Sequence, residues 1–163
     1  MIKVNDYPNL NAKIEEFGLI FPESLAILPD NLANAKSKNE LVNAQTTSTV
    51  RVLFRNAGIV ETPIEKDKEI PERILESFDW VGPTIFIASA LISQNPEIVD
   101  KTLGTILEYL QDFFKGIPKQ ERNAKLHIVT TTRKGDYKLV DYEGPENGLK
   151  ELPEVIRSLR DER

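Results

Sequence analysis

The chain has 163 residues, of which 40% are hydrophobic and 29% are charged, and its formal net charge is -5. This length suits a single domain, and the hydrophobic fraction is large enough to build a core. The acidic balance argues against a general binder of polyanions such as nucleic acids. Because the sequence has no Cys and a single His, it excludes disulfides, thiolate metal sites, cysteine nucleophiles and multi-histidine metal sites.

Neither export nor a membrane span is expected. Residues 1–10 include Asp6 and Pro8 and have no apolar core, so they do not resemble a secretory signal. The longest uncharged run covers residues 80–96, which is shorter than the roughly 20 apolar residues of a transmembrane helix, and Pro83 interrupts it. We expect this run to contain a buried helix that begins at Pro83. Together with the lack of Cys, these features predict a cytoplasmic protein.

The N-terminal part is expected to be rich in helix. Asn9 is a suitable N-cap for a short helix within Tyr7–Gly18, and Leu25–Leu28 has the composition of a strand between two prolines. Residues Ser37–Glu40 have the spacing of a capping box. This box predicts a helix over residues 41–45.

Residues 46–59 fit two structures. Apolar residues alternate from Val50 to Phe54, as in a strand, but the same stretch fits a helix that is capped by Ser48 and ends before Gly58. Because the cap and the stop both agree with a helix, we favour the helix. The acidic stretch of residues 61–79 then connects this part to the rest of the chain.

The C-terminal half carries clearer signals. Asn95–Glu97 form a strong helix start, and apolar residues follow at helical spacing as far as Gly116. Two β-rich segments, Lys125–Thr132 and Tyr137–Glu143, flank a turn at Lys134–Gly135 and predict a β-hairpin. Leucine-rich sequence after the hairpin predicts a terminal helix.

These elements predict an α+β fold. A small antiparallel sheet that contains the hairpin is expected to be packed by the long amphipathic helix and by the C-terminal helix, with an α-rich N-terminal part. The chain divides into an α-rich segment (residues 1–60), an acidic connection (61–79) and an α+β core (80–163), within one compact domain. If Pro83–Phe114 is more apolar than one small domain can cover, a homodimer should form through it.

The sequence offers no clear catalytic constellation. His127 is the single imidazole, and no nucleophile-elbow sequence accompanies it. Acidic pairs such as Glu108 and Asp112 follow helical spacing and are typical of a solvated helix face. The glycines are scattered, without a phosphate-binding or dinucleotide motif. We therefore expect no cofactor and no enzymatic activity; the alternative is an enzyme whose carboxylate, Thr or Tyr side chains meet only in the folded protein.

One stretch, from Lys115 to Lys138, is basic although the chain is acidic. A hairpin with a basic tip suits contact with an acidic protein surface, and nucleic-acid contact is a weaker alternative because few aromatic residues accompany the charges. A solvated hairpin whose edge lysines discourage strand addition explains the same pattern. The only Trp is either a pocket residue or a core anchor. The candidate interaction residues are Lys125, Arg133, Lys134, Lys138 and Trp80.

The second half also resembles a known class of protein. Its order is an apolar helical segment from Ala88–Leu91 to Phe114, a strand, a charged turn at Arg133–Asp136, a second strand and a leucine-rich helix. Over residues 78–159 this order resembles the effector-associated constant components of bacterial conflict systems. The resemblance implies an adaptor encoded beside effectors rather than a catalyst. We therefore predict a non-enzymatic protein-interaction module of a prokaryotic cytoplasm that has a protein partner.

Overall fold

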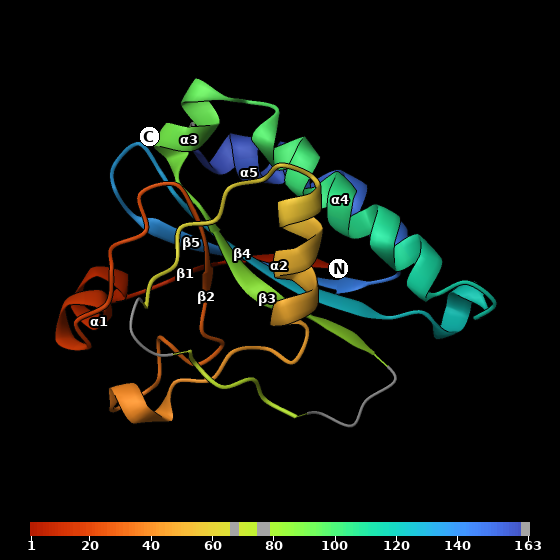
Figure 1. Ribbon diagram of the computed structural model, residues 1–163. Helices are drawn as coiled ribbons and strands as arrows, with labels where there is room; N and C mark the ends of the chain where they lie inside the picture. The colour runs from red at the N-terminus through yellow and green to blue at the C-terminus, as the bar shows by residue number, and fades with distance from the viewer. Residues whose placement is uncertain (66–68, 75–78, 161–163) are drawn as a thin grey trace.

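The computed structural model describes residues 1–65, 69–74 and 79–160. A mixed five-stranded sheet in the order β1-β5-β4-β3-β2 forms the centre of an α+β fold (Figure 1). The sheet is mixed rather than antiparallel as the sequence predicts, because β3 and β4 are parallel while the other neighbouring strands are antiparallel. The strands are β1 (Ile2–Asp6), β2 (Leu25–Leu28), β3 (Trp80–Ile87), β4 (Ala124–Thr131) and β5 (Tyr137–Gly144).

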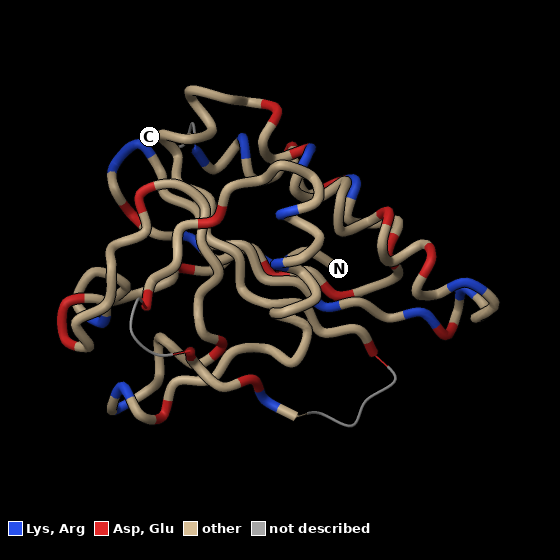
Figure 2. Tube along the Cα trace, viewed as in Figure 1, with Lys and Arg blue, Asp and Glu red and all other residues tan. Residues whose placement is uncertain are grey.

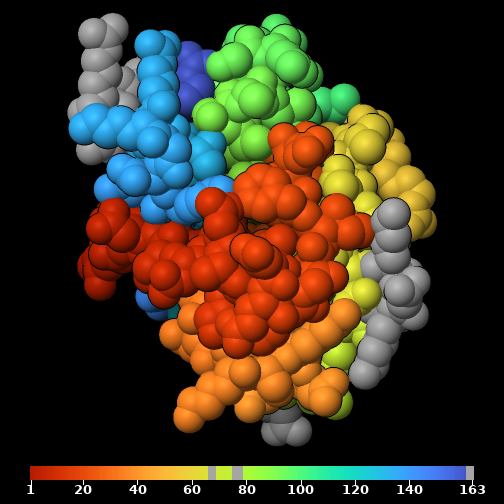
Figure 3. Space-filling model, turned by 90° about the vertical axis from the view of Figure 1, so that its left-hand side faces the viewer, coloured from red at the N-terminus to blue at the C-terminus, as the bar shows by residue number. Residues whose placement is uncertain are grey.

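Helices cover one face of this sheet, and the N-terminal part covers much of the other. The helices are α1 (Leu10–Glu16), α2 (Thr47–Asn56), α3 (Ser89–Gln94), α4 (Ile98–Phe113) and α5 (Leu152–Arg160). Apolar residues of α2, α4 and α5 form one core with β3 and β4 side chains such as Ile85 and Leu126. α1 and residues 32–41 form a second core with Phe86 and Val129 on the opposite face. Figure 3 shows these N-terminal residues packed beside the β4–β5 turn and α3.

The parallel pair of β3 and β4 determines where α4 lies. A connection between parallel neighbours must cross over the sheet, and α3 and α4 make this crossover. α4 buries the apolar stripe that the sequence predicts, including Leu103, Ile106 and Leu110. The stripe therefore belongs to the core of the single chain, so these residues do not form an exposed apolar face for a second copy.

The first 60 residues supply both edge strands of the sheet as well as α1 and α2. β1 pairs with β5, and β2 pairs with β3. Residues 1–60 and 80–163 therefore share one sheet. Among the described residues, no helix has the length and apolar character that a membrane crossing requires.

Most of the expected elements are confirmed: the helix within Tyr7–Gly18, the strand Leu25–Leu28, the helix in residues 46–59, the long helix before Gly116 and the hairpin. The helix expected from Pro83 onward is wrong, because residues 80–87 form the inner strand β3. This strand is buried on both faces, so its sequence shows a continuous apolar run instead of alternation. Pro83 lies at the register irregularity between Val81 and Thr84, where the ladder does not require its missing N–H.

The helix expected over residues 41–45 is also absent from the described structure. Ser37–Glu40 instead begin a single 3-10 turn at Lys38–Glu40, and the Glu40 carboxylate accepts a hydrogen bond from the Lys36 amide. Asn43 is extended and exchanges backbone hydrogen bonds with Pro71 and Arg73. The backbone of Asn43 therefore bonds to a distant segment rather than within a helix.

Two glycines are expected to respond oppositely to the same substitution. A β-carbon at Gly82 would lie 2.6 Å from two ring carbons of Trp80 and 2.8 Å from Cδ1 of Leu126, whereas one at Gly104, within α4, would meet nothing within 4 Å. Gly82→Ala should lower the free energy of unfolding by about 1–3 kcal/mol through overpacking. Gly104→Ala should raise it by about 0.5–1 kcal/mol because Ala has the better helix propensity. Urea denaturation measures both, and a Gly82→Ala variant as stable as the parent would contradict the packing described here.

Candidate functional site

The residues singled out from the sequence do not form one surface. Lys125 lies near the start of β4, whereas Arg133 and Lys134 lie in the turn after it. Eight residues of extended chain separate Lys125 from Arg133, a distance of about 25 Å. Trp80 is 2% exposed in the core between the sheet and α4. Figure 2 shows the basic positions of the Lys115–Lys138 stretch at opposite ends of the molecule.

Several of these basic side chains also have acidic neighbours. Nζ of Lys138 lies 2.6 Å from Oδ1 of Asp6. Nζ of Lys125 lies 3.9 Å from Oδ2 of Asp79 and 3.8 Å from a carboxylate oxygen of Glu143. The positive charge of this stretch is therefore divided and partly neutralised within the chain.

A groove lies between α2 and α4 on the helical face. It has a volume of about 760 Å³ and is open to solvent along its length. A second hollow of about 250 Å³ continues it toward the start of β3, and Tyr109 lines both. We call the two together the α2–α4 groove. Its lining residues include Thr46, Thr49, Leu53, Asn56, Ala57, Asp79, Trp80, Val81, Thr105, Glu108, Tyr109, Asp112 and Phe113.

Aromatic side chains gather at the end of this groove near β3. The rings of Tyr109 and Phe113 are 6.0 Å apart, and the ring of Phe113 meets that of Phe114 edge-on at 5.0 Å. Phe113 is 44% exposed, although Phe114 is buried. A single exposed hydrophobic side chain is ordinary on a protein surface, so Phe113 is a candidate contact because it lines the groove and not because of its exposure alone.

The rim of the α2–α4 groove is acidic. Glu108 and Asp112 line it from α4, and Asp79 lines its end near β3. Among the described lining residues there is no Lys or Arg. The groove therefore combines a mixed polar and apolar lining with a negative edge.

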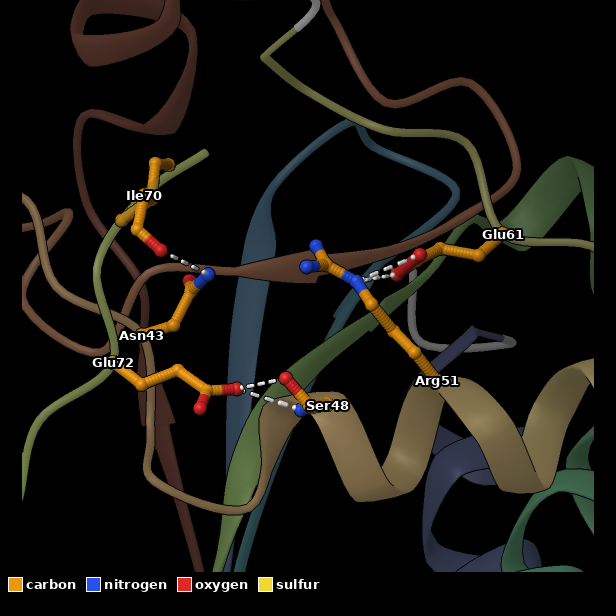
Figure 4. Close-up of polar contacts among 6 residues, drawn as sticks. All are labelled: Asn43, Ser48, Arg51, Glu61, Ile70 and Glu72. Atoms are coloured by element: carbon orange, nitrogen blue, oxygen red, sulfur yellow. Dashed lines mark hydrogen bonds and ion pairs between the residues drawn. The ribbon is translucent and has the colours of Figure 1, made fainter. Parts of the chain in front are cut away.

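Contacts from distant segments hold α2, which forms one wall of the groove. Thr46 Oγ1 donates a hydrogen bond of 2.6 Å to the Val81 carbonyl of β3. The Ser48 amide and hydroxyl both donate to one carboxylate oxygen of Glu72, at 2.8 and 2.6 Å (Figure 4). A carboxylate at this place satisfies an otherwise free amide of the first helical turn and complements the helix dipole.

A second set of contacts holds α2 and the loop that precedes it. Arg51 Nε donates to both carboxylate oxygens of Glu61, at 3.0 and 3.1 Å, and Asn43 Nδ2 donates to the Ile70 carbonyl (Figure 4). These bonds join α2 and the preceding loop to residues 61–72. The position of α2 thus depends on the acidic stretch that the sequence shows only as a connection.

A separate polar cluster lies on the opposite face of the sheet. His127 Nε2 and Asp141 Oδ1 are 2.6 Å apart on neighbouring strands, and Lys3 lies opposite Asp141 on β1. With Lys125 and Glu143 they line a hollow of about 260 Å³. Both members of the His127–Asp141 pair are more than a third exposed. Polar cross-strand pairs such as His127–Asp141 stabilise a solvated sheet face.

Asp30 and Tyr7, near this cluster, have perturbed pKa values. Burial raises the pKa of the Asp30 carboxyl above its ordinary value, and the charges of Arg73 and His127 partly oppose this rise. Burial, with a smaller contribution from the charge of Asp30, raises the pKa of Tyr7 to about 12. Asp30 combines burial with charge partners, an arrangement that is frequent at functional sites.

The cluster lacks the parts of a nucleophilic or metal-dependent active site. Catalysis of acyl transfer by His127 would need a hydroxyl nucleophile within hydrogen-bond reach, and no Ser or Thr is among the described residues that line its hollow. The described residues contain no group of three or more His, Asp or Glu side chains placed to hold a metal ion.

No protein-family model, curated protein or solved structure matches this chain. The resemblance to constant components therefore stays a prediction, and the function is argued from the geometry above.

The sequence analysis singled out Trp80 but did not identify the groove that this buried residue lines. The pattern of α4 identifies Glu108 and Asp112 as residues of the polar face and counts Phe113 among the apolar residues, but no local signal places any of the three beside α2. That proximity results from the crossover between β3 and β4. The helical pattern of residues 46–59 was the one available sign of the opposite wall.

Asp30→Asn should stabilise the protein at neutral pH. The folded state binds the Asp30 proton more tightly than the unfolded chain does. Ionisation of Asp30 therefore lowers the free energy of unfolding, and this loss is complete above the raised pKa. This loss disappears as the pH falls through that pKa, and it is absent below the unfolded value of about 3.8. The variant should melt about 1–4 °C higher at pH 7 and show a weaker dependence of Tm on pH in the acid range.

Asp136→Asn, in the exposed β4–β5 turn, is the matched control, and its melting temperature at pH 7 should stay close to that of the parent. Thermal unfolding followed by circular dichroism from pH 4 to pH 8 separates the two variants. An Asp30→Asn variant that melts below the parent at pH 7 would show that the Asp30 charge stabilises the fold.

Proposed function

We propose that this chain is a non-enzymatic protein-interaction module, an adaptor of a prokaryotic cytoplasm, and that it binds an amphipathic helical segment of a partner protein in the α2–α4 groove. The observation that carries the proposal is the combination of exposed Phe113, a long open hollow and an acidic rim on one surface. The cytoplasmic setting follows from the cysteine-free composition and is part of the same proposal.

The dimensions of the groove favour a helix as its occupant. Its volume lies within the roughly 300–1,000 Å³ of small-molecule sites, but the hollow is open rather than enclosed. α2 has ten residues and is therefore about 15 Å long, which matches about three turns of a docked helix. Helix-in-groove recognition uses apolar anchors at successive turns of the bound helix, and Leu53, Tyr109 and Phe113 offer the complementary surface.

The charge of the rim defines the partner further. Glu108 and Asp112 favour Lys or Arg residues that flank the apolar anchors of the bound segment. Complementary charge accelerates association at low salt and discriminates against acidic segments. The partner is therefore an amphipathic helix with basic flanks, and its binding should weaken as salt rises.

The basic turn offers a second, smaller contact. Arg133 and Lys134 lie in the exposed turn after β4, away from the groove. An acidic surface of the same partner or of another protein would suit this turn. Lys125 and Lys138, with their acidic neighbours, are weaker candidates for such a contact.

The resemblance of residues 78–159 to constant components agrees with an adaptor. The rival enzymatic hypothesis rests on Asp30, His127 and Asp141. His127 and Asp141 are cross-strand partners on an exposed sheet face, which is an ordinary arrangement there, and Asp30 lies outside the strands. Nucleic-acid binding would need the positive charge of the Lys115–Lys138 stretch on one surface, whereas this charge lies at two distant ends.

Phe113→Ala should abolish or strongly weaken capture of the partner. The tagged chain is purified from its native cell, and mass spectrometry identifies what accompanies it. Phe21→Ala is the matched control, because Phe21 is 42% exposed and lies outside the groove. Loss of an aromatic anchor typically weakens binding by about 10-fold or more.

Glu108→Gln with Asp112→Asn should reduce capture mainly at low salt, because these substitutions remove rim charge but little apolar contact. Circular dichroism establishes that each variant is folded. Equal recovery of one stoichiometric protein by Phe113→Ala and Phe21→Ala would refute the groove as the docking site. Recovery of the parent chain without any stoichiometric protein would refute the adaptor proposal.

A further inference from the structure

β1 forms an open edge of the sheet. It pairs with β5 on one side, and residues 3–6 of the strand are exposed. Val4 is 43% exposed. Among the described residues, no segment makes a backbone hydrogen bond to the outer side of β1. The opposite edge differs, because the Thr62 amide donates a hydrogen bond of 2.8 Å to the Leu25 carbonyl of β2.

The register shows which backbone groups of β1 point outward. The Tyr7 amide donates to the Tyr137 carbonyl at 2.9 Å, and the Glu143 amide donates to the Met1 carbonyl at 3.0 Å. Bonded and non-bonded pairs alternate along an antiparallel ladder, so the odd-numbered residues of β1 bond to β5. The N–H and C=O groups of the even-numbered residues therefore point away from the sheet. These residues are Ile2, Val4 and Asp6.

We propose that two copies of this chain associate through β1. The two strands pair antiparallel about a two-fold axis at Val4, and the two sheets join into one. Val4 of one copy pairs with Val4 of the other, and Ile2 of each pairs with Asp6 of the other. In this register every outward N–H meets an outward C=O.

The sequence of β1 favours a second copy of itself as the occupant. An axis at Lys3 would set two lysines directly opposite each other, and an axis at Asp6 would do the same with two carboxylates. An axis at Asn5 would set Ile2 opposite Pro8, which has no N–H to donate. The axis at Val4 instead places valine against valine and Lys3 against Asn5. No like charges then face each other across the new pair.

Charged residues normally protect an open edge, and β1 carries two, Lys3 and Asp6. Asp6 Oδ1 accepts a hydrogen bond of 2.6 Å from Lys138 Nζ, so this carboxylate is engaged within its own chain. Lys3 lies opposite Asp141 on β5, and with the axis at Val4 it faces Asn5 of the second copy rather than another charge.

This surface is independent of the α2–α4 groove. β1 is at one edge of the sheet, and β3, which forms part of the groove, is separated from it by β5 and β4. A variant that blocks the edge therefore leaves the groove intact, so the two proposals fail or hold separately.

Val4→Pro is the sharpest test. The Val4 amide points away from β5, so proline removes an edge donor without removing a bond of the β1–β5 ladder. The full chain with a C-terminal tag is measured by size-exclusion chromatography with light scattering between about 1 and 100 µM, the range expected for a small interface. The parent should approach twice the 18.5 kDa mass of one chain at the upper end, and Val4→Pro should remain at 18.5 kDa.

Val4→Ile keeps the amide and the apolar contact, and it should dimerise like the parent. Val4→Lys introduces a charge at the axis and should be monomeric, which preserves the test if the proline variant fails to fold. Hydrogen exchange of the Ile2 and Asp6 amides should slow with concentration in the parent and stay fast in Val4→Lys. A monomeric parent at the highest concentration overturns the proposal. A dimer that persists in folded Val4→Pro or Val4→Lys, or that forms without slower exchange at these amides, also overturns it.

Discussion

The architecture depends on the parallel pairing of β3 and β4. A hairpin cannot join parallel neighbours, so the chain between them must leave the sheet and return, and α3 and α4 occupy that connection. This crossover sets the apolar stripe of α4 against the sheet and leaves its polar residues Glu108 and Asp112 at the surface. α2 then packs beside α4, and the space that remains between the two helices is the α2–α4 groove. The candidate docking site is therefore a consequence of strand topology rather than of any motif.

The same topology explains which parts of the fold can be read from sequence. The β4–β5 hairpin, α4 and α2 have local signals, because their caps, turns and periodicity lie within short stretches. β3 lacks such a signal, because a strand buried on both faces presents an apolar run that also fits a helix. The Ser37–Glu40 capping box predicts a helix that does not form, because the Asn43 backbone bonds to Pro71 and Arg73 in a distant segment. In both cases contacts distant in sequence override a local preference.

The candidate sites differ in predictability for the same physical reason. Trp80 and the basic turn can be identified by residue type, but their placement relative to each other depends on the sheet. Strand length alone separates Lys125 from Arg133, and burial removes Trp80 from the surface that carries the charges. Asp30 had no sequence signal, because its perturbed pKa arises from burial and from Arg73 and His127, which lie far away in the chain. The basic residues that form one stretch in the sequence are thus divided in the folded chain. Asp30, Arg73 and His127, which are far apart in the sequence, are brought close together.

The two proposed contacts use opposite properties of the surface. The α2–α4 groove presents side chains, so its specificity depends on aromatic contact and on the sign of the rim charge. The edge of β1 presents backbone groups, so its affinity depends on hydrogen-bond register and its selectivity on the few side chains at Ile2, Val4 and Asp6. Because β5 and β4 lie between β1 and β3, pairing through β1 places the two grooves of a dimer far from each other. A dimer joined in this way would hold two partner segments at once, and a partner with two such segments would gain avidity without any new contact in either groove.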